Sequence, residues 1–253
     1  MKTMIFAAGL GTRLKPMTDT MPKALVPVGG RPLLQILLEK LARHGCTEAV
    51  INVHHFADMI EEWCASHHTD ISIRFSDERA ELLETGGGIR HAMPMLSGGR
   101  FLIHNVDILS NADLTRFYAE GEGKAATLLV SERKTQRYLL FDETMRLVGW
   151  INIQTKEIRT PFENIRQELE NMPQDALDTD NLHLRAFAGI HLIDTKLLDM
   201  MTGWPEKFSI IDFYLSICHS ANIKAYTQTG LNIVDVGKLD TLALAEEFIN
   251  KTH

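Results

Sequence analysis

Residues 4–14 read Met4-Ile5-Phe6-Ala7-Ala8-Gly9-Leu10-Gly11-Thr12-Arg13-Leu14, and Pro22-Lys23 follow shortly after. The apolar start of this run predicts a strand over Thr3–Ala8. The two glycines let the backbone approach a ligand and turn its N–H groups toward it. Arg13 and Lys23 add positive charge nearby. A strand that leads into such a loop is suited to hold a polyphosphate.

Two common phosphate-binding loops do not fit this run. A P-loop requires Gly-Lys followed by Ser or Thr, which the chain lacks. A dinucleotide-binding loop requires a third glycine where the chain has Leu14, and an acidic residue about twenty residues further on, where Gly29-Gly30-Arg31 offers none.

A third kind of loop does fit. The run 4–14, with Pro22-Lys23-Ala24-Leu25-Val26-Pro27 after it, resembles the nucleotide-binding signature of sugar-1-phosphate nucleotidyltransferases. The resemblance covers residues 1 to about 248 and is weakest over 131–182. It implies an α/β, Rossmann-like (GT-A-like) nucleotidyltransferase fold with a mixed, mostly parallel central sheet and helices on both faces.

The resemblance also implies one domain over residues 1–253. Its nucleotide-binding part is expected over about 1–130, its sugar-binding part over about 131–235 and a C-terminal helix over 238–250. The apolar periodicity agrees with alternating strands and helices. An antiparallel pair is expected from Tyr138–Phe141 and Leu147–Ile153, and the polar stretch Lys156–Leu182 predicts an insertion or flexible loop.

Composition limits the partners and the compartment. A formal net charge of −7 argues against a nucleic-acid surface. The sequence shows no secretory signal and no stretch that approaches a membrane span. Its three widely spaced cysteines favour a reducing, cytoplasmic setting over a disulfide framework. A homo-oligomer stays possible.

Two aspartates are candidate metal ligands. Asp107 follows the short apolar strand Phe101–His104, where a carboxylate suits Mg²⁺, and Asp235 lies in Ile233-Val234-Asp235-Val236-Gly237. The resemblance implies that both hold Mg²⁺ together with the substrate phosphates. The residues alone leave open that Asp107 caps the segment after it and that Asp235 is the N-cap of the last helix. Val106 stands where the family usually has glycine.

Glu84-Thr85-Gly86-Gly87-Gly88 is the second glycine-rich segment. Three successive glycines are costly in a folded domain and indicate a close contact, although a flexible linker is the alternative. The position of the segment predicts a loop at the strand-end crevice, and the resemblance implies that this loop holds the nucleobase and ribose. In all, the resemblance implies nucleotide contacts from Ala8, Gly9, Gly11, Thr12, Arg13, Lys23, Glu84, Thr85, Gly86, Gly87 and Asn105.

The sugar side gives a weaker signal. Ala188-Gly189-Ile190-His191 resembles the family strand that lines the sugar pocket, although a buried strand would read the same. Gly189 and Asn152 are the candidate sugar contacts. The family's Glu-Lys-Pro segment is absent, since Ile151-Asn152-Ile153 follows Trp150. This absence points toward the short, single-domain branch of the family.

The resemblance implies transfer of a nucleoside monophosphate from a nucleoside triphosphate to a sugar 1-phosphate, with release of pyrophosphate. Arg13 and Lys23 would act catalytically by offsetting charge. The short members most similar in these motifs are the N-acetylmuramate 1-phosphate uridylyltransferases, of use in cell-wall or surface-polysaccharide synthesis. Mannose-1-phosphate guanylyltransferase activity and a non-catalytic nucleotide-sugar-binding subunit are the alternatives.

Overall fold

The structure, a computed structural model, describes residues 1–170, 179 and 181–252. Within them a ten-stranded sheet has the order β11-β10-β9-β12-β6-β1-β4-β5, and β8 joins it by pairing with β12 and β13. The strands of this sheet are β1 (Lys2–Phe6), β4 (Glu48–Val53), β5 (Ser72–Asp77), β6 (Arg100–Asn105), β8 (Ala126–Ser131), β9 (Arg137–Asp142), β10 (Leu147–Asn152), β11 (Glu157–Arg159), β12 (Leu182–Asp194) and β13 (Ile223–Tyr226).

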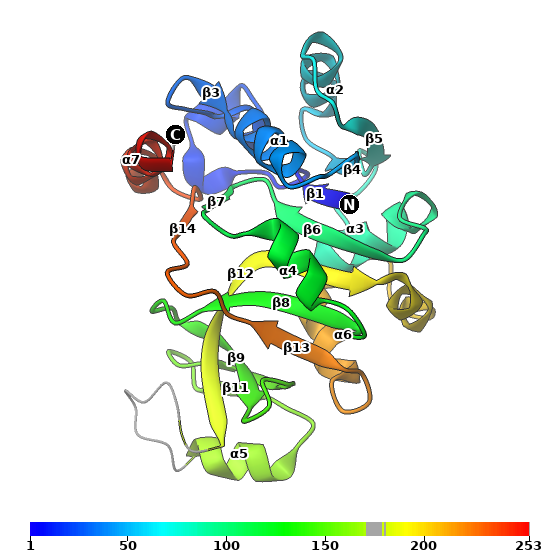
Figure 1. The fold of residues 1–253 in the computed structure, drawn as a ribbon, viewed down its shortest axis with the longest axis vertical. Coiled ribbons are helices and arrows are strands. Elements are labelled where there is room, and N and C mark those ends of the chain that lie inside the picture. The colour runs from blue at the N-terminus through cyan, green and yellow to red at the C-terminus, as the bar shows by residue number, and fades with distance from the viewer. Residues whose placement is uncertain (171–178, 180, 253) are drawn as a thin grey trace.

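The sheet is mixed, as the sequence predicts, and its two kinds of pairing occupy different regions. β1 pairs in parallel with β4 and β6, and β4 pairs in parallel with β5. β12 pairs antiparallel with β6, β8 and β9, and thereby connects the parallel part to the antiparallel strands β9, β10 and β11 (Figure 1). The predicted hairpin of β9 and β10 is confirmed.

Helices cover both faces of the sheet because neighbouring strand residues point to opposite sides. Met4, Val50 and Ile103 belong to one buried cluster with side chains of α3 and α6. Ile5, Ile51 and Leu102 belong to a second cluster with side chains of α1, α2 and α4. The helices are α1 (Leu33–Arg43), α2 (Ala57–Ser66), α3 (Glu84–Ala92), α4 (Leu114–Glu120), α5 (Glu163–Glu170), α6 (Ile210–Ile217) and α7 (Leu242–Thr252).

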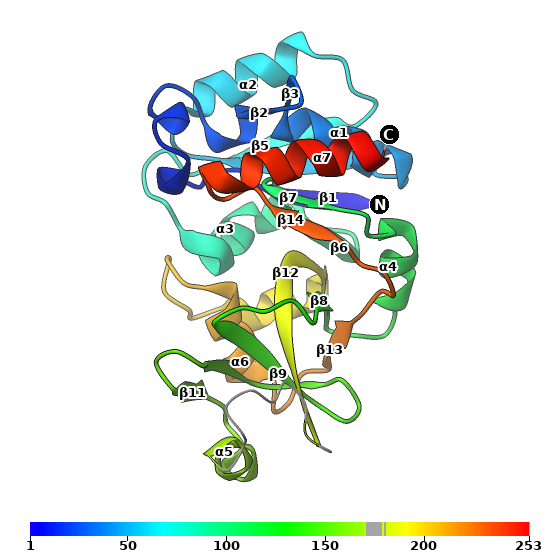
Figure 2. The ribbon, with the colours of Figure 1, turned by 90° about the vertical axis from the view of Figure 1, so that its left-hand side faces the viewer.

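A two-stranded ribbon brings the last strand back to the end of β6. β14 (Ile233–Asp235) pairs antiparallel with β7 (Ile108–Ser110), and α7 follows it. Figure 2 shows α7 lying along this ribbon and β2. Leu109, Val236 and Phe248 pack there with Val28 in a third buried cluster. The remaining short elements are β2 (Pro27–Val28), β3 (Arg31–Pro32) and the 3-10 turns Thr12–Leu14, Met17–Asp19, Lys23–Leu25, Met93–Met95, Thr195–Met201 and Leu239–Thr241.

Two predictions of local structure are wrong. Glu84–Gly88 is not a loop but the first turn of α3, because the N–H groups of Gly86 and Gly87 donate to the C=O of Phe208 and so find partners at the helix start. The stretch 156–170 contains β11 and α5, because Ile165 and Leu169 of α5 are buried against Tyr138 and Leu140. The remainder of the predicted insertion, residues 171–178 and 180, lies outside the described residues.

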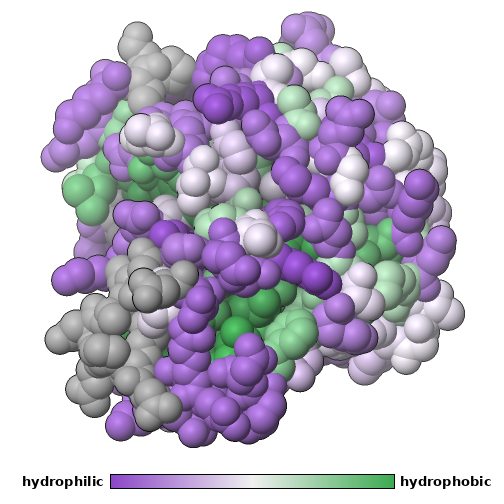
Figure 3. All heavy atoms as spheres, turned by 60° about the horizontal axis from the view of Figure 1, so that its bottom comes forward, coloured by the Kyte–Doolittle hydropathy of each residue, from purple (hydrophilic) through white to green (hydrophobic). Residues whose placement is uncertain are grey.

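The surface is mostly hydrophilic at the end of the molecule that Figure 3 brings forward, with apolar side chains in the hollows. Large hydrophobic side chains that are clearly exposed in the described part include Leu10 at 45% and Leu244 at 55%. In that same part of the chain, no helix has both the length and the apolar character needed to cross a membrane.

Candidate functional site

A cavity of about 440 Å³ opens at the carboxyl ends of three adjacent parallel strands, β1, β4 and β6. In open α/β sheets, ligands bind at this edge. The lining residues come from the ends of these strands, from the start of α3 and from the segment after β14: Phe6, Ala7, Ala8, Gly9, Leu10, Gly11, Thr12, Arg13, Lys23, Asn52, Leu82, Glu84, Thr85, Asn105, Val106, Asp107 and Gly237.

The loop after β1 has the geometry that its glycines predict. Gly11 has a φ of 63°, in the left-handed region, and its C=O accepts hydrogen bonds from Leu14 N at 2.8 Å and Thr18 Oγ1 at 2.9 Å. Among the described residues, no atom lies within 4 Å of the position that a Cβ on Gly9 would take. The backbone of Gly9 therefore faces open space, and residues 9–12 all line the cavity.

Asn52, which the sequence analysis does not select, fixes the start of this loop. Its Oδ1 accepts hydrogen bonds from the N–H groups of Ala7 at 2.7 Å and Ala8 at 3.2 Å. Ala8 lines the cavity, but its N–H is already used within the protein. A contact from Ala8 to a ligand would thus use its carbonyl or methyl group.

Lys23 and Asp107 meet in the cavity. Pro22 precedes the turn Lys23–Leu25, and the Lys23 Nζ forms an ion pair with Asp107 Oδ2. The side chains are 10% and 18% exposed, so both charges are largely removed from water while still lining the cavity. An ion pair in such a setting interacts more strongly than one on the surface.

Asp235 lies beside Asp107 because β14 pairs with β7. The N–H of Val236 donates to the C=O of Asp107 at 2.9 Å, which holds the two aspartates next to each other. Burial raises the pKa of the Asp235 carboxyl above its ordinary value, and the Asp107 carboxylate raises it further, while Lys23, Arg13 and Arg133 oppose the rise. The two predicted metal ligands are thus brought together although they lie far apart in the sequence.

The donor set suits a hard cation shared with a ligand. Asp235 Oδ1 is buried and has no hydrogen-bond partner among the described residues. Such an atom gains from a cation that it can coordinate, since an unpaired buried oxygen is costly. Among residues 1–170, 179 and 181–252 no three His, Cys, Asp or Glu side chains form a group able to hold a metal. A metal held by Asp107 and Asp235 would therefore take its remaining ligands from other oxygen atoms, such as those of phosphate or water.

Gly237 explains how Arg13 and Asp235 share this corner. A Cβ on Gly237 would lie 2.7 Å from Asp235 Oδ1 and 2.9 Å from Arg13 Nη2. A side chain at position 237 would displace one or both of these groups from their present positions. Within the part of the chain that the structure describes, Arg13 has no ion-pair partner, so its guanidinium can pair with an anionic ligand.

The second glycine-rich segment contributes fewer groups than the sequence predicts. Glu84 and Thr85 line the cavity, and Glu84 has the unusual φ of 61°. The Thr85 hydroxyl accepts a hydrogen bond from Ile210 N at 2.9 Å. Gly86 and Gly87 are buried and are absent from the lining; their N–H groups donate to the Phe208 carbonyl oxygen.

The sugar candidates lie at different depths. Gly189 has a φ of 73°, and a Cβ there would lie 2.8 Å from Asn105 Nδ2, so it sits directly behind a cavity residue. Asn152 is buried, and its Oδ1 accepts hydrogen bonds from the N–H groups of Gln154 and Thr155 in the turn after β10. Asn152 is not among the residues that line the cavity.

Sequence reasoning missed Asn52 and Glu78. A polar residue inside the apolar run Ala49–Val53 is a signal that could have revealed Asn52, since buried polar side chains need partners. Glu78 stands in Asp77-Glu78-Arg79, which reads as a solvated charge run, yet it is 2% exposed and bonded to Asn52. Nothing in the sequence distinguishes it from its exposed neighbours.

Residues 2–139, more than half of the chain, match the sequence model of the nucleotidyl transferase family. The chain therefore belongs to the nucleotidyl transferase family. The predicted family is confirmed, and with it the α/β fold.

Individual relatives agree with this assignment. N-acetylmuramate alpha-1-phosphate uridylyltransferases of Caulobacter vibrioides and of Neisseria meningitidis serogroup B are each 44% identical, over 107 and 116 residues. These matches cover 41% and 46% of this chain, and 44% and 50% of the two relatives, so they span half of each relative or less. The crystal structure of HddC from Yersinia pseudotuberculosis complexed with GMP-PN has a TM-score of 0.75 at 21% identity, covering 98% of this chain and 99% of that one, and shares the fold.

Proposed function

We propose that this protein transfers a nucleoside monophosphate from a nucleoside triphosphate to a sugar 1-phosphate and releases pyrophosphate. One observation carries the proposal: Lys23, Asp107 and Asp235 meet beside the glycine loop at the carboxyl ends of parallel strands. This combination offers cations and N–H groups to a polyphosphate, and carboxylates to a divalent cation.

The proposed reaction needs positioning more than covalent chemistry. An oxygen of the sugar phosphate attacks the α-phosphorus in line, and the bond to the β-phosphate oxygen breaks, so that pyrophosphate leaves. The N–H groups of Gly9, Gly11 and Thr12 would hold the triphosphate. Arg13 and Lys23 would lie against the charge that develops on the phosphate oxygens, which is where fixed cations lower the barrier.

Asp107 and Asp235 would hold Mg²⁺. The bound ion would supply positive charge to the phosphate oxygens. The unpartnered Oδ1 of Asp235 supports this assignment, since a cation would satisfy it.

We take UTP and N-acetylmuramate 1-phosphate as the substrates, because the two relatives at 44% identity carry that activity in their names. We place the reaction in the cytoplasm, in agreement with three free cysteines.

A pyrophosphate-release assay tests the proposal. Each of UTP, GTP, CTP and dTTP is combined with N-acetylmuramate, N-acetylglucosamine, mannose and glucose 1-phosphates in the presence of Mg²⁺. Pyrophosphate should be released fastest with UTP and N-acetylmuramate 1-phosphate. Preference for GTP and mannose 1-phosphate would replace the substrates but keep the reaction. Triphosphate binding without turnover on any pair would instead favour a non-catalytic subunit.

Two variants test the carboxylates in the same assay. Asp107→Asn and Asp235→Asn each remove one negative charge and keep the side-chain shape. Turnover should fall by about a hundredfold or more in each, on the scale of losing one strong electrostatic contact in a transition state. Near-wild-type turnover in either variant would show that its aspartate does not hold the metal.

A further inference from the structure

We infer that Asn52 and Glu78 are positioning residues that set the distance between the two walls of the nucleotide cavity, residues 7–14 and residues 82–85. The inference rests on the proposed function, since it takes both walls to hold one nucleoside triphosphate. Neither side chain is needed to touch the reacting atoms. Their role would be to keep the walls at the separation that the nucleotide requires.

Asn52 belongs to the first wall. It is 3% exposed, at the end of β4, and its Oδ1 accepts hydrogen bonds from Ala7 N at 2.7 Å and Ala8 N at 3.2 Å. Because backbone N–H groups can only donate, these contacts fix which end of the amide is oxygen. The Nδ2 must therefore point the other way, and it donates to Glu78 Oε1 at 2.8 Å.

Glu78 belongs to the second wall. It is 2% exposed, and its Oε2 accepts a hydrogen bond from Leu83 N at 3.2 Å, one residue before α3. Its own carbonyl oxygen accepts a hydrogen bond from His54 Nδ1 at 2.6 Å. A Cβ on Gly88 would lie 2.8 Å from Glu78 Oε1, so the first turn of α3 is packed directly on this carboxylate.

These bonds form one continuous chain from the loop after β1, through two buried side chains, to the start of α3. Leu82 and Glu84, on either side of Leu83, line the same cavity as Ala8 and Gly9. Water cannot replace a broken link where both partners are almost fully buried, so a lost bond leaves an unsatisfied group. The walls would then shift, and a shift of about 1 Å is enough to impair positioning.

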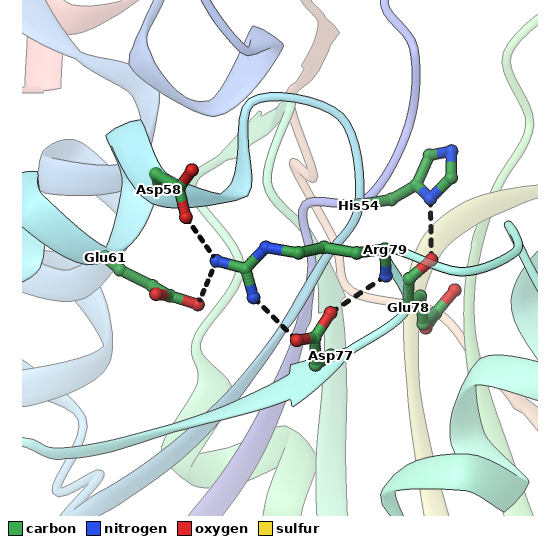
Figure 4. Close-up of polar contacts among 6 residues, drawn as sticks. All are labelled: His54, Asp58, Glu61, Asp77, Glu78 and Arg79. Carbon is green, nitrogen blue, oxygen red and sulfur yellow. Dashed lines mark hydrogen bonds and ion pairs between the residues drawn. The ribbon is translucent and has the colours of Figure 1, made fainter.

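The residue next to Glu78 provides a natural contrast. Figure 4 shows Arg79 reaching Asp58 and Glu61 of α2 and Asp77 of β5, on the side away from the Glu78 carboxylate. The Arg79 side chain is 37% exposed and Asp58 is 84% exposed, so solvent screens these ion pairs. Arg79→Gln therefore perturbs the same segment without breaking the buried chain.

An exchange of two atoms tests the inference. Asn52→Asp replaces the Nδ2 donor by an oxygen that faces Glu78. Glu78→Gln leaves either Asn52 Nδ2 or Leu83 N facing an NH₂ group. The double variant Asn52→Asp/Glu78→Gln restores every bond. The new carboxylate at position 52 accepts from Ala7 and Ala8, while the new amide at position 78 donates to that carboxylate and accepts from Leu83. The exchange also keeps the net charge of the pair.

Calorimetry with UTP and Mg²⁺, at a temperature where all variants are folded, measures the affinity, and kinetics measure both KM values. Each single variant should bind UTP about tenfold more weakly or worse, on the scale of a lost buried hydrogen bond to a charged group. KM for UTP should rise more than KM for the sugar phosphate. The double variant should recover to within about threefold of wild type, and Arg79→Gln should stay within about twofold. If one of the single variants does not fold, Asn52→Ala is measured in its place, and its affinity for UTP should also fall about tenfold.

Two results would overturn the inference. Single variants that melt earlier but bind UTP normally would show that the pair only stabilises the fold. A double variant that stays as weak as the singles would show that the bonding pattern is not what matters. A wild-type protein that binds no nucleoside triphosphate would contradict the proposed function and, with it, the inference. Normal wild-type turnover, together with equal UTP affinity in the wild type, both single variants and the double variant, would contradict the inference alone.

Discussion

Glycines cluster in two segments near the cavity: residues 9–11, which line it, and residues 86–88, which lie behind Glu84 and Thr85 and do not. Gly9 borders open space, and Gly11 takes a left-handed φ that turns the loop around the cavity. Gly86, Gly87 and Gly88 are buried, and a Cβ on each would strike Phe208, the Glu206 carbonyl oxygen or Glu78 respectively. Gly9 thus borders space that a ligand could occupy, whereas other protein atoms already occupy the space beside residues 86–88.

A run of glycines therefore indicates that some group lies close to the backbone, but it does not identify that group as ligand or protein. In residues 86–88 the approaching group is the segment 206–210, whose Phe208 carbonyl accepts from two helix-start N–H groups. The segment thereby fixes α3, and only the exposed start of the helix, Glu84 and Thr85, is left to line the cavity. Four substitutions test the comparison, in order of decreasing expected effect.

Gly87→Ala should have the largest effect, which is a loss of stability. The added Cβ would overlap the backbone oxygen of Glu206, which cannot rotate away as a side chain can. We expect a loss of about 3 kcal/mol in the free energy of unfolding, at the upper end for overpacking. Thermal and denaturant melting measure it. A Gly87→Ala protein that is as stable as wild type but binds UTP more weakly would show that Gly87 makes room for the nucleotide and not for the Glu206 backbone.

Lys23→Met should lower turnover and leave the stability of the fold nearly unchanged. Methionine keeps most of the stem volume and removes the charge that faces Asp107 and the cavity. Turnover should fall by about a hundredfold, with a smaller change in triphosphate affinity, because charge that matters most in the transition state raises turnover. Steady-state kinetics measure the loss of turnover, and a melting curve measures any loss of stability. Full turnover per folded molecule, combined with early melting, would make Lys23 structural.

Gly11→Ala should lower the stability by an intermediate amount, because it adds both backbone strain and a close steric contact. The φ of 63° strains a residue with a Cβ, and that Cβ would lie 2.9 Å from Thr18 Cγ2. We expect a loss of about 1–2 kcal/mol in the free energy of unfolding. Thr18→Ser removes the Cγ2 methyl and keeps the hydroxyl that donates to Gly11. The double variant should recover only the steric part of the loss; complete recovery would show that the backbone conformation costs nothing.

Gly9→Ala should have the smallest effect on the fold. Its φ is not in the left-handed region and nothing lies within 4 Å, so the melting temperature should change by no more than about 1 °C, as for a surface substitution. UTP affinity should nevertheless fall several-fold, on the scale of about 1 kcal/mol, because the methyl group enters the cavity. If Gly9→Ala lowers the melting temperature as much as Gly87→Ala does, then Gly9 is as closely packed by protein as Gly87, and the two segments do not differ.

The parts of the site that lie along one strand and its loop could be predicted from the sequence. The apolar run over residues 3–8 and the spacing of Gly9, Gly11, Arg13 and Lys23 are local patterns, and the structure places these four residues on the cavity. The meeting of Asp107 and Asp235 follows from family resemblance, because no local pattern links residues so far apart in sequence.

Other features depend on tertiary contacts that a single sequence does not display. α3 begins at Glu84 despite three glycines because Phe208 caps it. α5 forms in a polar stretch because Ile165 and Leu169 find an apolar surface on β9. Asn152, selected for the sugar, is bonded to its own turn. Glu78 lies within a charge run and is buried only because Asn52 and Leu83 bond to it.

The ribbon of β7 and β14 has a consequence for how the protein is made. A ribosome synthesises Asp107 well before Asp235, and the two meet only when Ile233–Asp235 pairs with Ile108–Ser110. Since domains fold as the chain emerges, β1, β4, β5 and β6 can associate while β14 is still in the exit tunnel. The nascent protein then has a glycine loop and one carboxylate, and the second carboxylate arrives only with this late, long-range pairing. Completion of the site therefore waits for the pairing of β14 with β7.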